Sequence, residues 1–398
     1  MTTTALQGLK VLDLSRVLAG PWAGQLLGDL GADVVKVEVP GTGDPFRAFK
    51  GGLYSPHFQT YNRNKRSIEL DTRKPDDREA FDRLVREADV YIQNFRPGFA
   101  EEIGCGEERL RALNPGLVYC AISGWGRDGP SAARPSYDTV AQAASGFLRL
   151  LVNPANPRVV GPAIADAMTG FYAALGILGA LVERGRSTPA ASPDAPGGRR
   201  VEVSMFEAMT HFNLDAYTHL FSEQEVMGPY SRPSVSQSYV LECGDGLWIA
   251  LHMSSPPKFW QGLARAMKQP DFFADLRFAT REARIEHQGE LIQVLGEIFQ
   301  RHDRAEWCRR LVAEDVPHAP MYRTDEVPDD PQAQHLQLFV EAPHPAGGTW
   351  RTVRSPLSFD GERALGVTAP PLLGQHNEAL RAGWVPREGE GTSGGNSA

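Results

Sequence analysis

The sequence predicts an α/β fold with a mainly parallel sheet over about the first 215 residues, followed by a smaller second lobe. Short apolar runs alternate there with helical patterns, which is typical of βαβ units. From about Ser222 the chain changes to Pro, Gly and Ser punctuation in "MGPYSRPSVSQ", which indicates a second lobe. At 398 residues the chain is also too long for one ordinary core.

The first predicted unit is "KVLDLSRVLAGPWAGQLLGDLGADVVKVE", in which VLDL and VVKVE are strands and AGQLLGDLG is a helix. The turn "SRVLAGPWAGQ" follows the first strand, where α/β sheets bind nucleotides. It is not G-x-G-x-x-G, so a nicotinamide or flavin fingerprint is absent. By itself this turn is more simply structural.

The second unit, "RSIELDTRKPDDREAFDRLVREADVYIQNF", repeats the plan with strands at SIEL and VYIQN. Between them Pro75 opens a helix to about Glu87 that is acidic at its start and basic later. A third strand follows in LVYCAIS, and helices dominate from about Tyr137 to Val182. "RRVEVSMFEAMTHF" then predicts another strand and helix.

The second lobe contains "SYVLECGDGLWIALHM", two runs around Gly-Asp-Gly that predict a hairpin. "HQGELIQVLGEIFQRHDRAEWCRRLVAEDV" predicts two short helices joined near His302. Beyond about Pro317 we expect loop and short strand. Two segments have the composition of disorder, namely "GRSTPAASPDAPGG" and the tail "REGEGTSGGNSA".

The composition of the chain limits the kinds of function that we expect for it. A net charge of -8 argues against nucleic acid or an anionic membrane as the main partner, which favours small molecules. The N-terminus lacks a secretory pattern, so we expect a cytoplasmic protein. The uncharged run from Ala167 to Val182 is short for a membrane span and predicts a buried helix. Four scattered cysteines and isolated histidines predict free thiols and no metal site.

Asp166 is a carboxylate at the head of this apolar run. The simpler interpretation is a helix N-cap, because aspartate is favoured there. The functional interpretation is that the helix N-terminus keeps a partly buried carboxylate ionised, and therefore nucleophilic, in an apolar pocket. Four small residues would let its helix pack closely, whether beneath a site or in a plain core: Gly170, Ala173, Ala174 and Gly176.

Two further groups of residues are ambiguous. The basic residues Arg63, Lys65, Arg66 and Arg96 would suit phosphate binding, but a solvated charge run is the simpler interpretation. Tyr137 and Asp138 precede another predicted helix, and Ser136 is also able to cap it. Helix capping explains that group equally well.

Taken together, these segments resemble the family III CoA transferases, which include formyl-CoA transferase, carnitine CoA transferase and, as a divergent branch, α-methylacyl-CoA racemase. The resemblance covers most of the chain and combines many ordered matches. They are "GLKVLDLSRVLAGPWAGQLLGDLGADVVKVE", "GDPFR", "NRNKRSIELD", "ADVYIQNFRPG", "SGWGRDGP", "SYDTVAQAASG", the Asp166 stretch, "RRVEVSMFEAM" and "PLLGQHNE".

The resemblance implies an interlocked homodimer with a large Rossmann-like domain made from both ends of the chain and a smaller inserted α+β domain. We therefore expect the first part of the large domain at residues 1–221, the inserted domain at 222–325, a return segment at 326–386 and a disordered tail at 387–398. It implies no prosthetic group, with acyl-CoA and a carboxylic acid as the substrates.

For the site, the resemblance implies that Asp166 is the nucleophile, forming an aspartyl anhydride and then an aspartyl-CoA thioester, and that Tyr137 faces the acyl group. By matching motifs it also implies a set of CoA-lining residues, the basic ones toward phosphates and the apolar ones toward adenine or pantetheine. They are Arg16, Leu18, Ala19, Leu70, Asp71, Thr72, Arg73, Asn94, Phe95, Arg96, Ser136 and Asp138.

Two departures from the family pattern bear on the substrate. Formyl-CoA transferase has glutamine where this chain has Leu18, and a glycine-rich small-domain loop that is absent here, so oxalate and formate are not the expected acids. The racemase branch has His-Asp where this chain has Tyr137-Asp138, and tyrosine is a poor base at neutral pH. A 2-methylacyl-CoA racemase with Asp166 as acid/base is therefore the first alternative, and a catalytically silent acyl-CoA-binding protein is the second.

Overall fold

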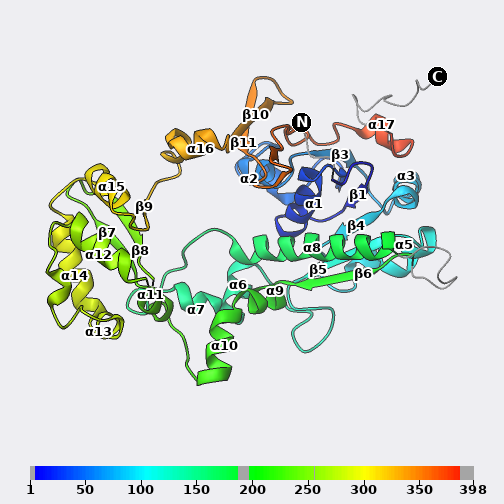
Figure 1. Cartoon of the computed structure of the whole chain (residues 1–398). Helices are drawn as coiled ribbons and strands as arrows, with labels where there is room; N and C mark the ends of the chain where they lie inside the picture. Colours follow the sequence, from blue (N-terminus) through cyan, green and yellow to red (C-terminus); the bar gives the residue numbers. More distant parts are fainter. Residues whose placement is uncertain (1–4, 187–196, 255, 386–398) are drawn as a thin grey trace. The chain divides into compact units, whose positions relative to one another are not determined.

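The computed structural model describes residues 5–186, 197–254 and 256–385 (Figure 1). The chain divides into two compact units. The first unit contains residues 1–148, 161–214 and 337–398, and the second contains 149–160 and 215–336. Most of the two segments predicted to be disordered, residues 187–196 and 387–398, lies outside the described residues.

A six-stranded sheet forms the centre of the first unit. Its strands are β1 (Lys10–Asp13), β2 (Asp33–Glu38), β3 (Lys65–Glu69), β4 (Val90–Gln93), β5 (Val118–Ser123) and β6 (Arg200–Ser204). They are ordered β3-β2-β1-β4-β5-β6, and every neighbouring pair is parallel. The predicted α/β class and parallel sheet are therefore confirmed, in the strand order of doubly wound nucleotide-binding folds.

The helices of the first unit include the predicted ones and four short helices that were not predicted. The helices of this unit are α1 (Ala19–Asp29), α2 (Pro56–Thr60), α3 (Pro75–Glu87), α4 (Phe99–Glu102), α5 (Glu107–Leu113), α6 (Asp138–Ala144), α8 (Ile164–Arg186), α9 (Met205–Phe212) and α17 (Asn377–Arg381), with the 3-10 turn η1 (Pro45–Ala48). The four that were not predicted are α2, α4, α5 and α17. The bounds predicted for α3 are confirmed. The expected helical stretch from Tyr137 to Val182 is interrupted, because residues 152–163 form neither helix nor strand.

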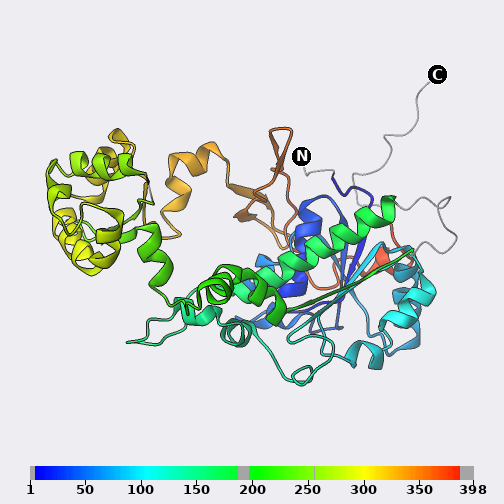
Figure 2. The same cartoon turned by 60° about the horizontal axis from the view of Figure 1, so that its bottom comes forward.

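Helices lie on both faces of the sheet (Figure 2). Their side chains form two apolar layers that enclose it. Alternate strand residues point to opposite faces, so Leu12 and Tyr91 join the layer of α3 and α5, whereas Val11 and Ile92 join the layer of α1 and α8. The strands are buried on both sides, which explains their continuous apolar runs. The sheet is thereby fixed between helices, and its strand ends form an edge on which side chains can gather.

Helix α8 is long and apolar enough to cross a membrane by length and composition, but 39% of its most apolar window is buried within the chain. One face packs on α1 and the sheet through residues such as Ala173 and Ile177. The opposite face exposes Phe171, Leu175 and Val182 by 53%, 56% and 60%. The prediction of a buried helix was therefore wrong for this second face.

The C-terminal part of the chain returns to the first unit. It contributes β10 (Phe339–Pro343), β11 (Thr349–Val353), β12 (Ser358–Phe359) and β13 (Glu362–Arg363), which form two antiparallel pairs. Residues of the return segment then cover the edge strand β3: the His376 N–H donates to the Ser67 carbonyl at 3.0 Å, and the Glu69 N–H donates to the Asn377 side chain at 2.7 Å.

The second unit is built around the antiparallel sheet β7-β8-β9. Its elements are α11 (Ser231–Ser236), β7 (Ser238–Glu242), β8 (Trp248–His252), α12 (Pro257–Ala266), η2 (Phe272–Ala274), α13 (Arg281–Glu286), α14 (Gln288–Phe299), α15 (Arg304–Ala313), β9 (His318–Pro320), η3 (Val327–Asp329) and α16 (Pro331–His335). The chain also forms α7 (Phe147–Leu151) and α10 (Leu214–Glu223) where the units meet in sequence. The predicted hairpin and the two helices joined near His302 are confirmed.

Candidate active site

The strand order places the candidate site at the centre of the sheet. β1 pairs with β2 on one side and with β4 on the other, so the direction of the connections changes between β1 and β4. Ligands of open α/β sheets bind outside the carboxyl ends of the strands at such a point. The turn after β1 and the segment after β4 therefore meet where a ligand crevice is expected.

A cavity of about 220 Å³ lies at this point. The predicted site residues that line it are Arg16, Leu18, Ala19, Asn94, Phe95, Arg96, Ser136, Tyr137 and Asp166. Sequence reasoning missed other lining residues, among them Val17, Arg134 and Met205. Arg134 carries no motif signal that separates it from other exposed arginines, and it stacks its guanidinium on Trp125 at 4.8 Å.

A second cavity of about 330 Å³ collects the other predicted CoA residues, Leu70, Asp71, Thr72 and Arg73. Arg16 lines both cavities. The structure thus brings the predicted set into two cavities that share one arginine, and Asp138 lines neither of them. This division suits an elongated ligand with chemically different ends.

Asp166 is the third residue of α8 rather than the residue before it. The N-cap interpretation of its carboxylate is therefore wrong. Its side chain is partly buried, and burial, with a smaller contribution from the charge of Asp138, raises its pKa to about 7. The expectation that the helix N-terminus keeps this carboxylate ionised is corrected by the same observation, because the shift is upward.

Asp138 is the residue that caps α8. One oxygen of its carboxylate, Oδ1, accepts the main-chain N–H of Ala165 at 2.7 Å and that of Asp166 at 3.3 Å, while Oδ2 accepts Nε2 of Gln142 at 2.6 Å. The interpretation of Asp138 as a cap of its own helix α6 is therefore wrong. Its carboxylate joins the starts of two helices.

Tyr137 is the N-cap residue of α6, but its side chain makes no capping hydrogen bond. It is 72% exposed and lines the cavity that contains Asp166. The Oγ atom of the neighbouring Ser136 is buried without a hydrogen-bond partner among the described residues. Capping therefore accounts for neither side chain, and the Tyr137 hydroxyl is open to a ligand.

Helix α8, which carries Asp166, packs closely on α1, which follows the turn after β1. A Cβ atom added to Gly170 would lie 2.4 Å from the carbonyl oxygen of Ala19, a lining residue of the cavity. On another side of α8, a Cβ at Gly176 would lie 2.7 Å from Val201. The prediction that small residues let this helix pack closely is confirmed at both glycines.

The basic run after α2 does not face solvent or a ligand. Arg63 pairs with Asp29, Lys65 with Asp13 and Arg66 with Asp33, at distances of 2.5 to 2.8 Å. The three basic side chains are almost completely buried. Both interpretations of this run, phosphate binding and a solvated charge run, were therefore wrong. Its charges are neutralised by paired carboxylates inside the sheet layer, where a buried ion must be paired.

Arg16 and Arg96 are different, because no carboxylate of the described residues lies within ion-pair distance of either guanidinium. The Arg16 guanidinium lies over the ring of Phe95 at 5.1 Å. Burial lowers the pKa of Arg16, and the charge of Asp44 opposes that shift. Unpaired guanidinium groups at a cavity wall are suited to phosphate, which they bind through charge-assisted hydrogen bonds.

The start of α1 adds main-chain donors to the same cavity. This helix begins at Ala19 and has no side-chain cap, so its first N–H groups lack acceptors within the helix. Leu18 and Ala19 line the cavity that Asp166 also lines. Such N–H groups stabilise negative charge on a ligand oxygen.

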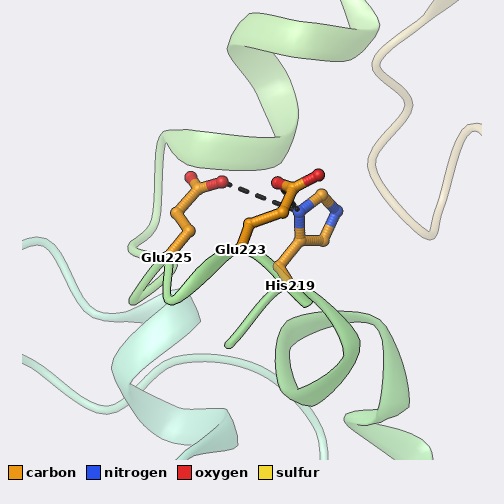
Figure 3. Close-up of side chains that lie close together, drawn as sticks. All are labelled: His219, Glu223 and Glu225. Carbon is orange, nitrogen blue, oxygen red and sulfur yellow. Dashed lines mark hydrogen bonds and ion pairs between the residues drawn. The ribbon is translucent and has the colours of Figure 1, made fainter. Parts of the chain in front are cut away.

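A different group of side chains has the ligand types of a metal site. The side chains of His219, Glu223 and Glu225 offer ligand atoms close to one another (Figure 3). Nδ1 of His219 lies 3.2 Å from Glu223 and 3.6 Å from Glu225, so these groups already pair with one another on an open surface. Exposed clusters of this kind are common without a metal, and no metal role follows from this one.

The comparisons with known proteins define the class. The family model of CoA-transferase family III matches residues 6–377, and the chain belongs to this family. It is therefore an enzyme that acts on CoA esters. The expected family resemblance and enzyme class are confirmed.

Relatives with different acid substrates are about equally similar. The chain is 32% identical to a formyl-CoA:oxalate CoA-transferase of Streptomyces coelicolor, covering 96% of each protein. It is 32% identical to a succinyl-CoA–D-citramalate CoA-transferase of Chloroflexus aurantiacus, covering 94% of this chain and 92% of that protein. A CAIB/BAIF family protein of Brucella suis has a similar crystal structure, with 32% identity and a TM-score of 0.82 over 96% of this chain and 99% of that one.

Proposed function

We propose that this protein is an acyl-CoA:carboxylate CoA transferase in which Asp166 is the nucleophile. The observation that carries this proposal is the position of Asp166 in one cavity with the unpaired Arg16, the open hydroxyl of Tyr137 and the first amides of α1. A nucleophile, a phosphate-binding cation and donors for a developing oxyanion are the groups that acyl transfer from CoA requires.

The reaction proceeds in two exchanges. The Asp166 carboxylate attacks the acyl carbonyl of the donor thioester, the C–S bond breaks, and CoA leaves as a thiolate. The thiolate attacks the aspartyl carbonyl of the mixed anhydride, which releases the donor acid and leaves an aspartyl-CoA thioester. The acceptor carboxylate attacks this thioester to form a second anhydride and thiolate, and the thiolate then takes the acceptor acyl group and restores Asp166.

The environment of Asp166 supports this role. A pKa of about 7 gives a more basic, less solvated carboxylate than an exposed aspartate, and about half of it is ionised at neutral pH. The N–H groups of Leu18 and Ala19 are suited to the oxyanions that form at each addition. The Tyr137 hydroxyl is a further donor at the same cavity wall.

A racemase acting on 2-methylacyl-CoA is the second candidate. The same pKa of about 7 favours it, because a group that titrates near neutral pH is a good acid/base catalyst. It also requires a second group to exchange the proton from the opposite face. Tyr137 lines the same cavity, but it is a tyrosine where the racemase branch has histidine.

One experiment separates the two candidates. The protein is incubated in heavy water with a panel of acyl-CoAs and carboxylic acids, including oxalate, succinate and D-citramalate, and both the protein and the recovered thioesters are measured by mass spectrometry. A covalent adduct on Asp166 and a new CoA ester without α-deuterium would support the transferase. Deuterium at the α-carbon without an adduct would contradict the transferase and support the racemase.

We further propose that the chain acts as a homodimer. The apolar face of α8, formed by Phe171, Leu175 and Val182, is exposed in the single chain. Exposed apolar side chains gathered in a stripe along one helix are typical of a protein interface. A second copy of the chain is the partner that the family resemblance implies. It would cover the stripe, which belongs to the same helix as Asp166.

A further inference from the structure

The turn after β1 contains a strained residue. Val17 has a φ of 70°, in the left-handed region that branched side chains avoid. It lies between Arg16, which lines both cavities, and Leu18, which lines the cavity of Asp166. A strained conformation persists only where surrounding groups hold it, and such strain concentrates at functional sites.

Two side chains from other segments hold this turn, one from the start of η1 and one from just after β4. Both carboxylate oxygens of Asp44 accept the main-chain N–H of Val17, at 3.2 and 3.1 Å. Asn94 pairs with the main chain of Arg16 in both directions: its Oδ1 accepts the Arg16 N–H at 2.8 Å, and its Nδ2 donates to the Arg16 carbonyl at 2.7 Å. Asn94 also lines the cavity, whereas Asp44 lines neither cavity.

Asp44 is itself fixed by buried neighbours. Its side chain is completely buried, and Nζ of Lys36 lies 3.0 Å from Oδ2. The same Nζ donates to the carbonyl of Ser15 at 2.9 Å, so one lysine joins the Asp44 carboxylate to the start of the turn. The Asp44 N–H donates to Glu38 at 3.0 Å, and Oδ1 also accepts the N–H of Phe46.

We propose that Asp44 is a positioning residue for CoA-ester binding and turnover. It holds Val17 in the left-handed conformation, which directs the Arg16 side chain to the cavities and sets where the N–H groups of Leu18 and Ala19 lie. This inference rests on the proposed function for its link to turnover, since the groups that Asp44 positions are those assigned to phosphate and oxyanion binding. Asp44 acts without touching the substrate.

The test compares matched variants. Asp44→Asn keeps the size of the side chain and one oxygen acceptor for Val17 but removes the charge that Lys36 pairs with. Asp29→Asn is the control, because Asp29 is also a buried carboxylate with a basic partner, and its hydrogen bonds go to Arg63 and Asn64 rather than to the turn. Val17→Gly supplies a residue that adopts a positive φ without strain. It therefore reduces the need for the clamp, by which we mean the hydrogen bonds from the Val17 N–H to Asp44.

The readouts are the dissociation constant of CoA, kcat and KM for the acyl-CoA donor, and the melting temperature. We expect Asp44→Asn to weaken CoA binding and lower kcat/KM by about 10- to 100-fold, as a small misplacement of binding groups does. Asp29→Asn should lower the melting temperature at least as much while kcat/KM stays within about twofold. In the Val17→Gly background the effect of Asp44→Asn should be at least about threefold smaller, because the two sites are coupled.

Equal losses of kcat/KM in Asp44→Asn and Asp29→Asn would overturn the inference. The same loss of kcat/KM from Asp44→Asn with and without Val17→Gly would also overturn it. These outcomes are distinct from failure of the proposed function. If the wild-type protein transfers no acyl group in the panel, the transferase proposal fails, and the CoA dissociation constants still test the clamp. If it transfers acyl groups and the variants show no coupling, only the positioning role fails.

Discussion

The carboxylate of Asp138 accepts the main-chain N–H of Asp166 at 3.3 Å, so the acid that caps α8 is different from the acid that lines the cavity. Asp138 also accepts the N–H of Ala165. The N–H of Ala167 donates to the carbonyl of Ala163, so these first N–H groups of α8 have partners other than the Asp166 side chain. The cap and the cavity-lining acid are therefore separate carboxylates, and burial, together with the charge of the first, raises the pKa of the second.

The pH dependence of catalysis follows from this relationship. Asp166 must be ionised to attack, and its pKa is about 7, so we expect kcat/KM to rise with pH and to level off above that value. In Asp138→Asn the amide oxygen still caps α8 but the like charge is gone, so the midpoint should move to lower pH. A pH–rate profile in which the midpoint stays in place or moves up would contradict this assignment.

Asp166 should also reduce stability at neutral pH. The folded pKa of about 7 exceeds the ordinary value of 3.8, so the folded state binds the extra proton between these values and stability falls as pH rises through them. Asp166→Asn should therefore unfold at a higher urea concentration than the wild type at pH 8. The gain in the free energy of unfolding should be a few kcal/mol at most, at about 1.4 kcal/mol per pKa unit. The gain should shrink at pH 5, and a variant that is less stable at pH 8 would refute this.

Packing of α8 on α1 can be tested with two glycines of one helix. Gly170→Ala places a Cβ against the Ala19 carbonyl and should destabilise the fold by about 1–3 kcal/mol through overpacking. Gly179→Ala meets nothing within 4 Å in the single chain and should stabilise the monomer by about 0.5–1 kcal/mol through helix propensity. Urea unfolding of both variants measures the difference in their free energies of unfolding. Equal effects would show that the contact between α8 and α1 tolerates a methyl group.

The buried basic run should act on stability rather than on CoA affinity. Lys65→Met leaves the carboxylate of Asp13 buried without its cation and should cost about 3–5 kcal/mol. Arg73 is exposed and lines the second cavity, so Arg73→Ala should weaken CoA binding while stability changes by less than about 1 kcal/mol. Denaturation and CoA titration of both variants check the assignment, which fails if their effects are exchanged.

The apolar stripe of α8 predicts the oligomeric state. Leu175→Glu places a charge in the middle of the stripe and should convert the dimer to monomers in sedimentation velocity experiments. Leu276→Glu is the control, because Leu276 is 86% exposed and lies in the second unit. If both variants sediment as the wild type does, the stripe is not the interface.

Much of the fold could be predicted because its local signals agree. Strands buried on both faces appear as continuous apolar runs, and α3 carries proline at its start, acids in its first turn and a base in its last. The end of the apolar run at Asp166 was harder to interpret. The helix starts two residues before this aspartate, and its cap comes from Asp138, 28 residues earlier in the chain.

The site residues could be named from motifs, but their environments could not. Arg63, Lys65 and Arg66 look like Arg96 in the sequence, yet the first three are paired inside the unit and Arg96 is exposed. Strand register and long-range contacts decide which charges are neutralised. The clamp of Asp44 on Val17 was missed for the same reason, since a left-handed valine leaves no pattern in the sequence.

The covered edge of β3 has a consequence for how the chain is made. Ser67 and Glu69 receive their hydrogen-bond partners from His376 and Asn377, about 300 residues later. During synthesis the edge of this sheet therefore stays open while the whole second unit leaves the ribosome, and open strand edges pair readily with other chains. The nascent first unit thus depends on protection from aggregation until the end of translation, and a chain that stops before residue 374 keeps that open edge permanently.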